Sequence, residues 1–579
     1  EVQVMLRRIF SYMKEYKKYA WLALICIGVE VVLEIMVPKL MADLIDIGVT
    51  NSDVPYIINK GIQMAVCAVA ALILGVGSAR FSALAGQGLG ANIRKAEYEK
   101  LQSYSFSNID HFSVSSLVTR LTSDVTNIQN AVSTGMRPFG RSPVMLIFAT
   151  TLAFKINSTL ALVFLVALPV LAVLLIIIII NVGPRYGRMQ GAVDLVNRCI
   201  EENLTAVRVV KSYVRGDYEI EKFRNVNDNL KNESEKAFGI AVLNMPAMQF
   251  VMYSTILGIL LIGGRLINSG QMMIGQLTSF LSYVLLILNS LMMMSNVFLL
   301  MTRSLASAER IMKVIDEPID ITDENARNIE VKKGEIEFNH VWFKYNETAK
   351  EYVLSDVSFH INAGQTVGII GQTGSSKTTL IQLIPRLYDA SKGEIKIDGI
   401  NVKEYPVRHL RDAISVVLQK NTLFSGSLID NLRWGNENAT LDEIKEACSI
   451  ACVDEFIDRL PGGFDAEMGQ EGVNVSGGQK QRICIARAIL KKPKVLILDD
   501  STSAVDTATE GKIRNALAKK LPDMTKIIIA QRISSVRHAD QIIIMDGGCV
   551  NAIGTHESLL KTNKIYQEIY ESQKEGADL

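Results

Sequence analysis

Six apolar stretches in the first 303 residues constrain the fold of this 579-residue chain more than any other feature. Each stretch approaches the ~20 residues that an α-helix needs to cross the hydrocarbon core of a bilayer. The stretches therefore predict six membrane-spanning helices. The expected spans are 19–42, 57–85, 136–156, 159–181, 241–266 and 275–302.

The segments that join these spans differ in length and in charge. Spans one and two, three and four, and five and six are joined by short turns that are nearly free of Lys and Arg. The other two segments, 86–135 and 182–240, are long, look helical and carry basic residues such as Arg120 and Arg208. The positive-inside rule therefore predicts a multi-pass protein of the cell membrane, with its amino terminus, both long segments and its carboxyl-terminal half in the cytoplasm.

Two carboxylates lie inside the first span. Glu30 and Glu34 are one helical turn apart and so share one face of the helix. Because a charge in lipid is expensive, that face should point at protein or at a wet cavity. One interpretation is an acidic spot in a transport path, which would favour a cation or a proton. The other interpretation, which we favour, is a structural pair that is solvated in a cavity or neutralised by a basic residue such as Arg80.

The last predicted span is rich in methionine and contains Met292, Met293, Met294 and Met301. Flexible thioether side chains can form an adaptable surface for a transported molecule. They also fill irregular gaps between packed helices, and the sequence favours this second interpretation.

The pattern changes after the last apolar stretch. From Glu335 onward, short β-branched strands alternate with helices, which is typical of an α/β fold. We therefore expect a transmembrane domain at 1–303, a linker at 304–334 and a second domain at 335–579. The net charge of +1 gives no reason to expect nucleic acid as a partner.

A glycine-rich segment of the second domain has the pattern of a phosphate-binding loop. The strand candidate 366–370 runs into residues 371–378 (GQTGSSKT), which open a helix. In this context the backbone N–H groups cradle phosphates, Lys377 reaches the β and γ oxygens, and the Thr378 hydroxyl binds magnesium. Ser376 stands where the consensus has its last glycine. The sequence therefore predicts a nucleotide site with an unusual backbone position at Ser376.

A second acidic element follows further along the chain. The apolar strand candidate 495–499 ends in Asp499, and Asp500 comes next. A carboxylate at the end of such a strand lies beside the phosphate loop and holds the shell of a magnesium ion. Asp499 is therefore the candidate metal ligand of this segment.

Further motifs occur in the order and spacing of the ATP-binding cassette (ABC) exporters, and the chain resembles this family over essentially its whole length. Tyr345 matches the aromatic residue that stacks on adenine, and Gln419 matches the glutamine that senses magnesium. Residues 474–482 (NVSGGQKQR) resemble the family signature, with Val475 in place of the usual leucine. Residues 503–506 (SAVD) match the loop that crosses to the partner cassette.

The signature has a physical role that involves a second cassette. Ser476, Gly477 and Gly478 open a helix, so a hydroxyl, bare backbone amides and the positive end of the helix dipole face outward together. In the family these groups cap the γ-phosphate on the facing cassette, which implies an obligate dimer. The resemblance also implies coupling regions at 108–124 and 209–223, where cytoplasmic loops dock on the cassettes.

The resemblance implies an all-α six-helix transmembrane domain followed by an α/β nucleotide-binding domain, with ATP and magnesium as cofactors. The expected magnesium ligands are Thr378, Gln419 and Asp499. The residues expected to bind the nucleotide are Tyr345, Gly371, Gln372, Thr373, Gly374, Ser375, Ser376, Lys377, Thr378, Thr379, Gln419, Ser476, Gly477, Gly478 and Gln479.

Two positions depart from the family at the catalytic centre. The family has glutamate, which activates the attacking water, where this chain has Asp500, and a switch histidine where it has Gln531. A carboxylate displaced by about an ångström can lose about a hundredfold in rate. Glutamine can hydrogen-bond a phosphate but cannot carry a proton and its charge. With Lys377, these two residues are the catalytic candidates of a degenerate site.

The expected function is therefore half of an ATP-driven exporter, whose signature completes the hydrolytic site of a different partner chain. Its cargo would be a small molecule, drug, lipid or peptide. The alternatives are a homodimeric exporter with slow hydrolysis, an ATP-gated regulator or channel, and a nucleotide-binding scaffold. An importer is disfavoured because the spans precede the cassette on one chain, an order that the family associates with export.

Overall fold

The computed structural model describes residues 2–500 and 505–575, and the chain divides into two compact units. The first unit comprises Glu1–Gln102 and Val114–Glu317, and the second comprises Ser103–Ser113 and Pro318–Leu579. A short segment from the helical half of the sequence thus belongs to the second unit. The domain boundaries predicted at 303 and 335 did not anticipate that Ser103–Ser113 belongs to the second unit. The boundaries themselves stay a prediction.

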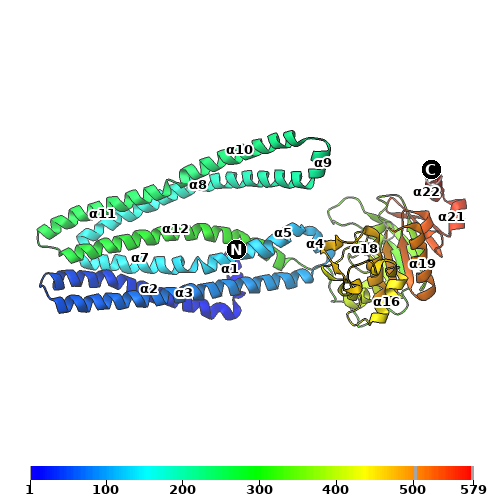
Figure 1. Cartoon of the computed structure of the whole chain (residues 1–579), viewed down its shortest axis with the longest axis horizontal. Coiled ribbons are helices and arrows are strands. Elements are labelled where there is room, and N and C mark those ends of the chain that lie inside the picture. Colours follow the sequence, from blue (N-terminus) through cyan, green and yellow to red (C-terminus); the bar gives the residue numbers. More distant parts are fainter. Residues whose placement is uncertain (1, 501–504, 576–579) are drawn as a thin grey trace. The chain divides into compact units, whose positions relative to one another are not determined.

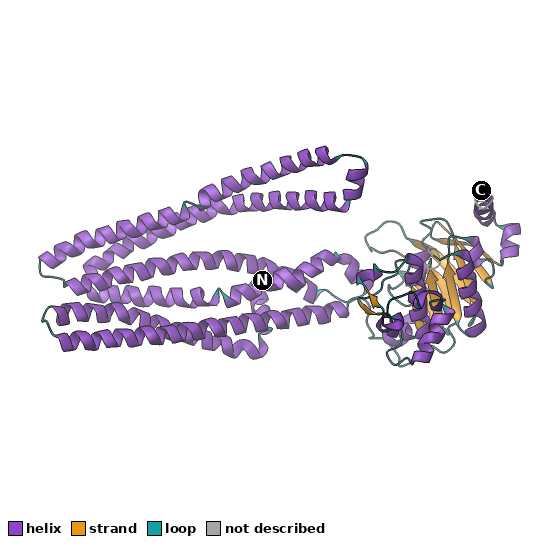
Figure 2. Ribbon diagram, viewed as in Figure 1, coloured by secondary structure: helices purple, strands orange, loops and turns teal. Residues whose placement is uncertain are grey.

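The described residues of the first unit form helices and no strands (Figure 2). Three short turns of other helical types, η1 (Lys14–Tyr16), η2 (Leu44–Val49) and η3 (Arg120–Asp124), interrupt the α-helices. The α-helices are α1 (Val2–Ser11), α2 (Lys17–Asp43), α3 (Val54–Gln102), α5 (Val114–Thr119), α6 (Val125–Ser133), α7 (Met136–Ile156), α8 (Ser158–Thr205), α9 (Val207–Ser212), α10 (Gly216–Ala241), α11 (Asn244–Asn268) and α12 (Ile274–Asp316).

The predicted spans fall on six long helices, namely α2, α3, α7, α8, α11 and α12. Among the described residues, five helical stretches are long and apolar enough to cross a membrane, and they account for every predicted span except the fourth. The fourth span, 159–181, lies within α8, which has 48 residues. The predicted helical transmembrane domain is therefore confirmed.

Three of these helices are much longer than a bilayer is thick. Helices α3, α8 and α12 contain 49, 48 and 43 residues. At a rise of ~1.5 Å per residue they are roughly 65–74 Å long, about twice the ~30 Å of a hydrocarbon core. The extensions of α3 and α12 pack with α1 and α6 around an apolar core of their own, which includes Ile9, Leu89, Ile93 and Ile311.

The second unit combines sheets and helices (Figure 1). A six-stranded sheet has the order β12-β11-β3-β10-β9-β6, and a four-stranded sheet has the order β2-β1-β4-β5. The strands are β1 (Ile336–Phe343), β2 (Leu354–Ile361), β3 (Thr366–Ile370), β4 (Lys392–Ile397), β5 (Ile400–Asn401), β6 (Ile414–Val417), β7 (Gly426–Ser427), β8 (Glu467–Met468), β9 (Val495–Asp499), β10 (Thr525–Ile529), β11 (Gln541–Asp546) and β12 (Cys549–Gly554).

Helices surround these sheets and the short β7–β8 pair. They are α4 (Phe106–His111), α13 (Lys377–Gln382), α14 (Val407–Ala413), α15 (Leu428–Arg433), α16 (Leu441–Ile450), α17 (Asp454–Ile457), α18 (Gly477–Leu490), α19 (Thr507–Lys520), α20 (Ile533–Val536), α21 (His556–Thr562) and α22 (Lys564–Glu575).

Four neighbouring strands position the candidate site. Strands β3, β10, β9 and β6 run parallel to one another. Every residue of β9 (VLILD) and β10 (TKIII) is buried, in keeping with the apolar runs that make up most of each strand. Because parallel strands bring their carboxyl ends to one edge, ligands bind at that edge in open α/β sheets. The phosphate loop, Gln419, Asp499 and Gln531 all follow these strand ends.

The segment Ser103–Ser113 packs against residues of the second unit. Ser105 caps α4 through a capping box with Asn108, whose side-chain amide also donates a hydrogen bond to the carbonyl of Pro318 at 2.8 Å. The ring of Phe106 lies 6.0 Å from that of Tyr388. Residues 108–113 of the coupling region predicted at 108–124 thus belong to the second unit, together with the preceding residues 103–107. The docking role of this region stays a prediction.

Candidate nucleotide-binding site

The phosphate loop connects β3 to α13 at the centre of the six-stranded sheet. A side chain at Gly371 would collide with the carbonyl of Met545, so this position requires glycine. Gly374 and Ser376 both adopt positive φ angles, +86° and +67°. Ser376 is thus an L-residue in the left-handed region at the N-cap of α13, where the family consensus has glycine.

The lysine of the loop points into the same cradle. Its ammonium group donates hydrogen bonds to the carbonyls of Gly371 and Gln372 at 2.9 and 2.8 Å and to the Ser375 hydroxyl at 3.2 Å. Burial lowers the pKa of Lys377, whereas Asp500 and Asp499 oppose this shift. The cation is therefore held by weak dipoles that phosphate oxygens, as charged acceptors, can replace.

A cavity of about 330 Å³ lies beside the loop. It gathers residues from the four strand ends and from the start of α13. Its lining consists of Thr373, Gly374, Ser376, Lys377, Thr378, Thr379, Gln419, Asp499, Asp500, Ile529 and Gln531. Seven of the fifteen nucleotide-binding residues predicted from the sequence line this cavity, together with the predicted residues Asp499, Asp500 and Gln531. They come from segments far apart in the chain.

The oxygen atoms around Thr378 suit a magnesium ion. The Thr378 hydroxyl donates a hydrogen bond to Oδ1 of Asp499 at 3.2 Å, while Oδ2 of Asp499 is buried and has no hydrogen-bond partner among the described residues. Burial, reinforced by Asp500, raises the pKa of Asp499. A hard cation prefers oxygen ligands of this kind and would relieve the buried charge, so these residues fit magnesium.

Asp500 is engaged by the two glutamines of the site. The side-chain amide of Gln531 donates a hydrogen bond to Oδ2 of Asp500 at 3.0 Å, and Gln419 also hydrogen-bonds this carboxylate. The backbone of Asp500 has a φ of +46°, and its N–H bonds to the carbonyl of Ile529 at 3.0 Å. Burial raises the pKa of Asp500 despite these hydrogen bonds. The Asp500 carboxylate thus accepts hydrogen bonds from neutral amides, which cannot accept or donate a proton in catalysis as a histidine can.

The adenine-binding candidate lies next to the loop helix. The Tyr345 side chain is 48% exposed, and its hydroxyl hydrogen-bonds the Thr379 hydroxyl at 2.9 Å and the Gln382 side chain at 3.2 Å. Its ring meets that of Tyr388 nearly edge to face, with centroids 5.2 Å apart. An exposed, anchored ring at this place can stack on a purine base.

The signature residues form the start of α18. The Ser476 hydroxyl accepts a hydrogen bond from the N–H of Gln479, and the Gln479 side chain accepts one from the N–H of Ser476 at 2.8 Å. Ser476 and Gly477 are exposed, and none of the four signature residues 476–479 lines the cavity beside the phosphate loop. The predicted crossing loop 503–506 begins in residues 501–504, which lie outside the described part of the chain.

The two glutamates of the first span are ion-paired. Arg137 contacts Oε1 of Glu30 at 2.6 Å, and Arg141 contacts Oε1 of Glu34 at 2.6 Å and Oε1 of Glu30 at 3.6 Å. The partners are therefore residues of α7 rather than Arg80. The sequence held a signal that we missed, because Arg137 and Arg141 have the same four-residue spacing as the glutamates.

Comparisons with known proteins agree with this architecture. Residues 20–291 match the family model of the ABC transporter transmembrane region, and residues 354–503 match that of the ABC transporter. The chain is 38% identical over 575 residues to the uncharacterized ABC transporter ATP-binding protein YfiB of Bacillus subtilis, covering 99% of this chain and 100% of that protein.

Two further similarities concern exporters. The chain is 32% identical over 493 residues to an ATP-dependent lipid A-core flippase of Desulfotalea psychrophila, covering 84% of this chain and 85% of the relative. A bacterial Atm1-family ABC exporter solved with ATP bound superposes with a TM-score of 0.82 at 22% identity, covering 97% of this chain and 98% of that one. This structural likeness establishes the shared fold.

The helical membrane half and the phosphate-loop domain together define an ABC exporter with its transmembrane and ATP-binding domains fused on one chain. The chain belongs to the ABC transporter family. It is a membrane-embedded transport ATPase, and its cassette is cytoplasmic, as the distribution of basic residues predicted.

Proposed function

We propose that this chain is the degenerate-site half of a heterodimeric exporter. The observation that carries the proposal is the pairing of Asp500 with Gln531 at 3.0 Å. Activation of the attacking water requires a carboxylate placed at that water and a group that can exchange a proton. Here the carboxylate is one methylene shorter than glutamate and is bonded to amides. This site would hold ATP for long periods and hydrolyse it slowly.

The signature supports a role in the partner's site. Ser476, Gly477 and Gly478 retain the family sequence, and the first two are exposed at the start of a 14-residue helix. The helix dipole and the bare N–H groups favour a phosphate there. In the proposed dimer they cap the γ-phosphate of ATP held by the partner's loop.

Exposed apolar side chains also support assembly with a second half. In the first unit, Tyr213 and Val214 directly follow α9 and are 75% and 87% exposed. In the second unit, stacked rings of Phe424 and Trp434, 4.1 Å apart, line a cavity of about 330 Å³. Large exposed apolar groups mark interaction surfaces. We propose that region 209–223 docks on a cassette of the assembled dimer.

In the proposed cycle, Thr378, Asp499 and Gln419 would hold magnesium when ATP is bound. The ion would supply charge neutralisation between the phosphates. Lys377 binds the phosphate oxygens, and Tyr345 orients the base. Closure of the two cassettes around ATP moves the coupling segments, and hydrolysis at the competent site resets them. The cycle moves the cargo out of the cytoplasm. We also propose that the transmembrane domain spans 1–303 and the nucleotide-binding domain spans 335–579.

Two matched substitutions test the heterodimer. The complex is purified with its partner half, and its total ATPase rate is measured. Asp500→Asn should leave the rate within about twofold, whereas Ser476→Arg should reduce it at least about tenfold, because a bulky cation blocks the cap on the partner's ATP. A collapse of activity in Asp500→Asn would refute the degenerate assignment, as would brisk hydrolysis by this chain purified alone. Homodimerisation of an active chain would then be the better description.

A further inference from the structure

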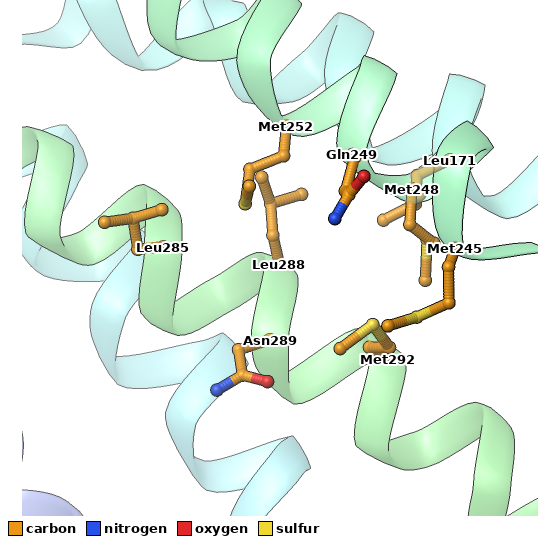
Figure 3. Close-up of a pocket in the computed structure, with 9 residues that line it drawn as sticks. All are labelled: Leu171, Met245, Met248, Gln249, Met252, Leu285, Leu288, Asn289 and Met292. Atoms are coloured by element: carbon orange, nitrogen blue, oxygen red, sulfur yellow. The ribbon is translucent and has the colours of Figure 1, made fainter.

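A cavity of about 290 Å³ lies within the transmembrane unit, between α8, α11 and α12 (Figure 3). Its volume is near the lower end of the ~300–1,000 Å³ typical of small-molecule pockets. The lining residues are Leu171, Met245, Met248, Gln249, Met252, Leu285, Leu288, Asn289 and Met292. All nine are uncharged, and all belong to one compact unit.

The lining combines adaptable apolar groups with two amides. Four methionines from α11 and α12 supply flexible, polarizable side chains, which suit ligands of varied shape. Gln249 enters from α11 and Asn289 enters from α12, so the two amides reach the same cavity from different helices (Figure 3). Of the methionines that the sequence singled out, Met292 lines this cavity.

The amides indicate what the cavity faces. Gln249 and Asn289 are both exposed, and neither has a hydrogen-bond partner among the described residues. Both lie within predicted spans, 241–266 and 275–302. Polar side chains at membrane depth are expensive in lipid and usually face the bundle interior or a water-filled cavity. The cavity is therefore better placed on a wet path than against lipid tails.

The two glutamates of the first span lie elsewhere and are ion-paired. Glu30 and Glu34 on α2 are paired with Arg137 and Arg141 on α7, and none of these four residues lines the cavity. A cation would gain no carboxylate in the cavity, and an anion would gain no guanidinium or ammonium group. Each would lose hydration without compensation.

We infer that this cavity is the cargo site and that it takes uncharged amphiphiles, molecules with an apolar body and one or two hydrogen-bonding groups. The methionines and leucines hold the body, while Gln249 and Asn289 each offer a donor and an acceptor to the polar groups. This inference rests on the proposed exporter function, because it names the cargo class of the same transport path. Selection against ions follows from the absence of charge in the lining.

The experiment uses the complete exporter, purified with its partner half in detergent. Radiolabelled progesterone is the uncharged probe and radiolabelled tetraphenylphosphonium is the cationic one, with binding followed by scintillation proximity. Gln249→Leu and Asn289→Leu should each weaken progesterone binding about fivefold, and the double variant about tenfold or more, because each removes one hydrogen bond. Gln249→Glu should weaken progesterone binding and strengthen tetraphenylphosphonium binding.

Basal ATPase activity is measured on the same preparations. If all variants hydrolyse ATP and bind progesterone like the parent, the cargo inference fails while the exporter function stands. The inference would also be overturned if the parent bound tetraphenylphosphonium in preference to progesterone and lost this binding in Glu34→Gln. That result would favour Glu30 and Glu34 as an acidic cargo site. A thiol introduced as Gln249→Cys that reacts in this chain alone but not in the complex would show the cavity to be filled by the second half. If the parent binds progesterone but ATP never drives its transport in vesicles, the exporter function fails instead.

Discussion

The Tyr388 hydroxyl donates a hydrogen bond to Oδ2 of Asp110 at 2.6 Å, although the two residues are 278 positions apart in the sequence. Burial, followed by the nearby Asp110 carboxylate, raises the pKa of Tyr388, so the phenol stays protonated and remains the donor. The same ring lies 5.2 Å from that of Tyr345, the adenine-binding candidate. One side chain thus touches both the base site and the segment Ser103–Ser113.

Removal of this hydroxyl should loosen the segment without disturbing the ring contacts. Tyr388→Phe deletes a hydrogen bond to a charged acceptor, a loss of about 1.5–3 kcal/mol in local stability. We expect faster deuterium exchange in the peptide that covers 103–113 and ATP affinity within about twofold of the parent. Tyr405→Phe is the matched control, because its hydroxyl bonds the carbonyl of Ile397 instead. Equal exchange in Tyr388→Phe and the parent would contradict the expectation.

Ser376→Gly should strengthen the phosphate loop. The native φ of +67° is disfavoured for an L-residue by roughly 1–2 kcal/mol, and glycine adopts it freely. We expect ATP to bind several-fold more tightly, as measured by equilibrium binding with a fluorescent ATP analogue. Ser376→Ala keeps the strain and should show no gain. Equal improvement by both substitutions would mean that the serine hydroxyl, rather than the backbone, limits affinity.

The two departures at the catalytic centre should be partly reversible. Asp500→Glu with Gln531→His restores the family residues, and we expect a rise in hydrolysis at this chain's own site by at least about tenfold. The measurement is made in a Ser476→Arg background, where the partner's site is blocked. Asp500→Glu alone should give a smaller rise, since Gln531 cannot carry a proton. No increase in the double variant would show that another feature, such as Ser376, limits this site.

Glu97 should make stability depend on pH. It is fully buried in the cytoplasmic extension of α3, and burial, aided by Asp124, raises its pKa to about 8. The opposing charges of Arg120 and Arg94 lower it less. The folded state holds a proton that the unfolded chain releases above its ordinary pKa of ~4.3. Stability contributed by this proton is therefore full at low pH and declines as the pH rises from about 4.3 to about 8.

Glu97→Gln should remove this decline. The melting temperature of the variant should exceed that of the parent by a margin that grows from pH 5 to pH 8 and is then constant. At pH 8 the free energy of unfolding of the variant should exceed that of the parent by a few kcal/mol. Glu99→Gln, an exposed neighbour on the same helix, is the control and should melt like the parent. A constant difference across the whole range would assign the effect to packing.

The ion pairs between α2 and α7 should be structural. Arg141→Leu removes the ion-pair partner of Glu34, whereas Glu30 keeps Arg137 at 2.6 Å. The substitution should destabilise the transmembrane unit by about 3 kcal/mol, read from thermal unfolding in detergent. Adding Glu34→Gln to Arg141→Leu should restore much of the loss, because the uncompensated charge is removed. Failure of this restoration would mean that Arg141 acts through its packing.

Some of this molecule follows from local sequence and some does not. The spans were predictable because hydropathy over ~20 residues is a local property, and the phosphate loop because its glycines and lysine are contiguous. The partners of Glu30 and Glu34 were not, since their choice of Arg137 and Arg141 depends on how α2 meets α7. The transfer of Ser103–Ser113 to the second unit was likewise missed, because Asn108, Asp110 and Tyr388 meet only in the fold.

By itself, the sequence determined the six helices, the parallel strands with their phosphate loop, and the presence of Asp500 and Gln531 at two positions of the candidate site. Each of these depends on residues close together in the chain or on the identity of one residue. The tertiary structure alone decided that Gln531 would hydrogen-bond Asp500 and that Tyr388 would contact both Tyr345 and Asp110. It also decided that the amides of Gln249 and Asn289 would line one methionine-rich cavity. These relationships need segments distant in sequence to be held a few ångströms apart, which only the packing of helices and strands achieves.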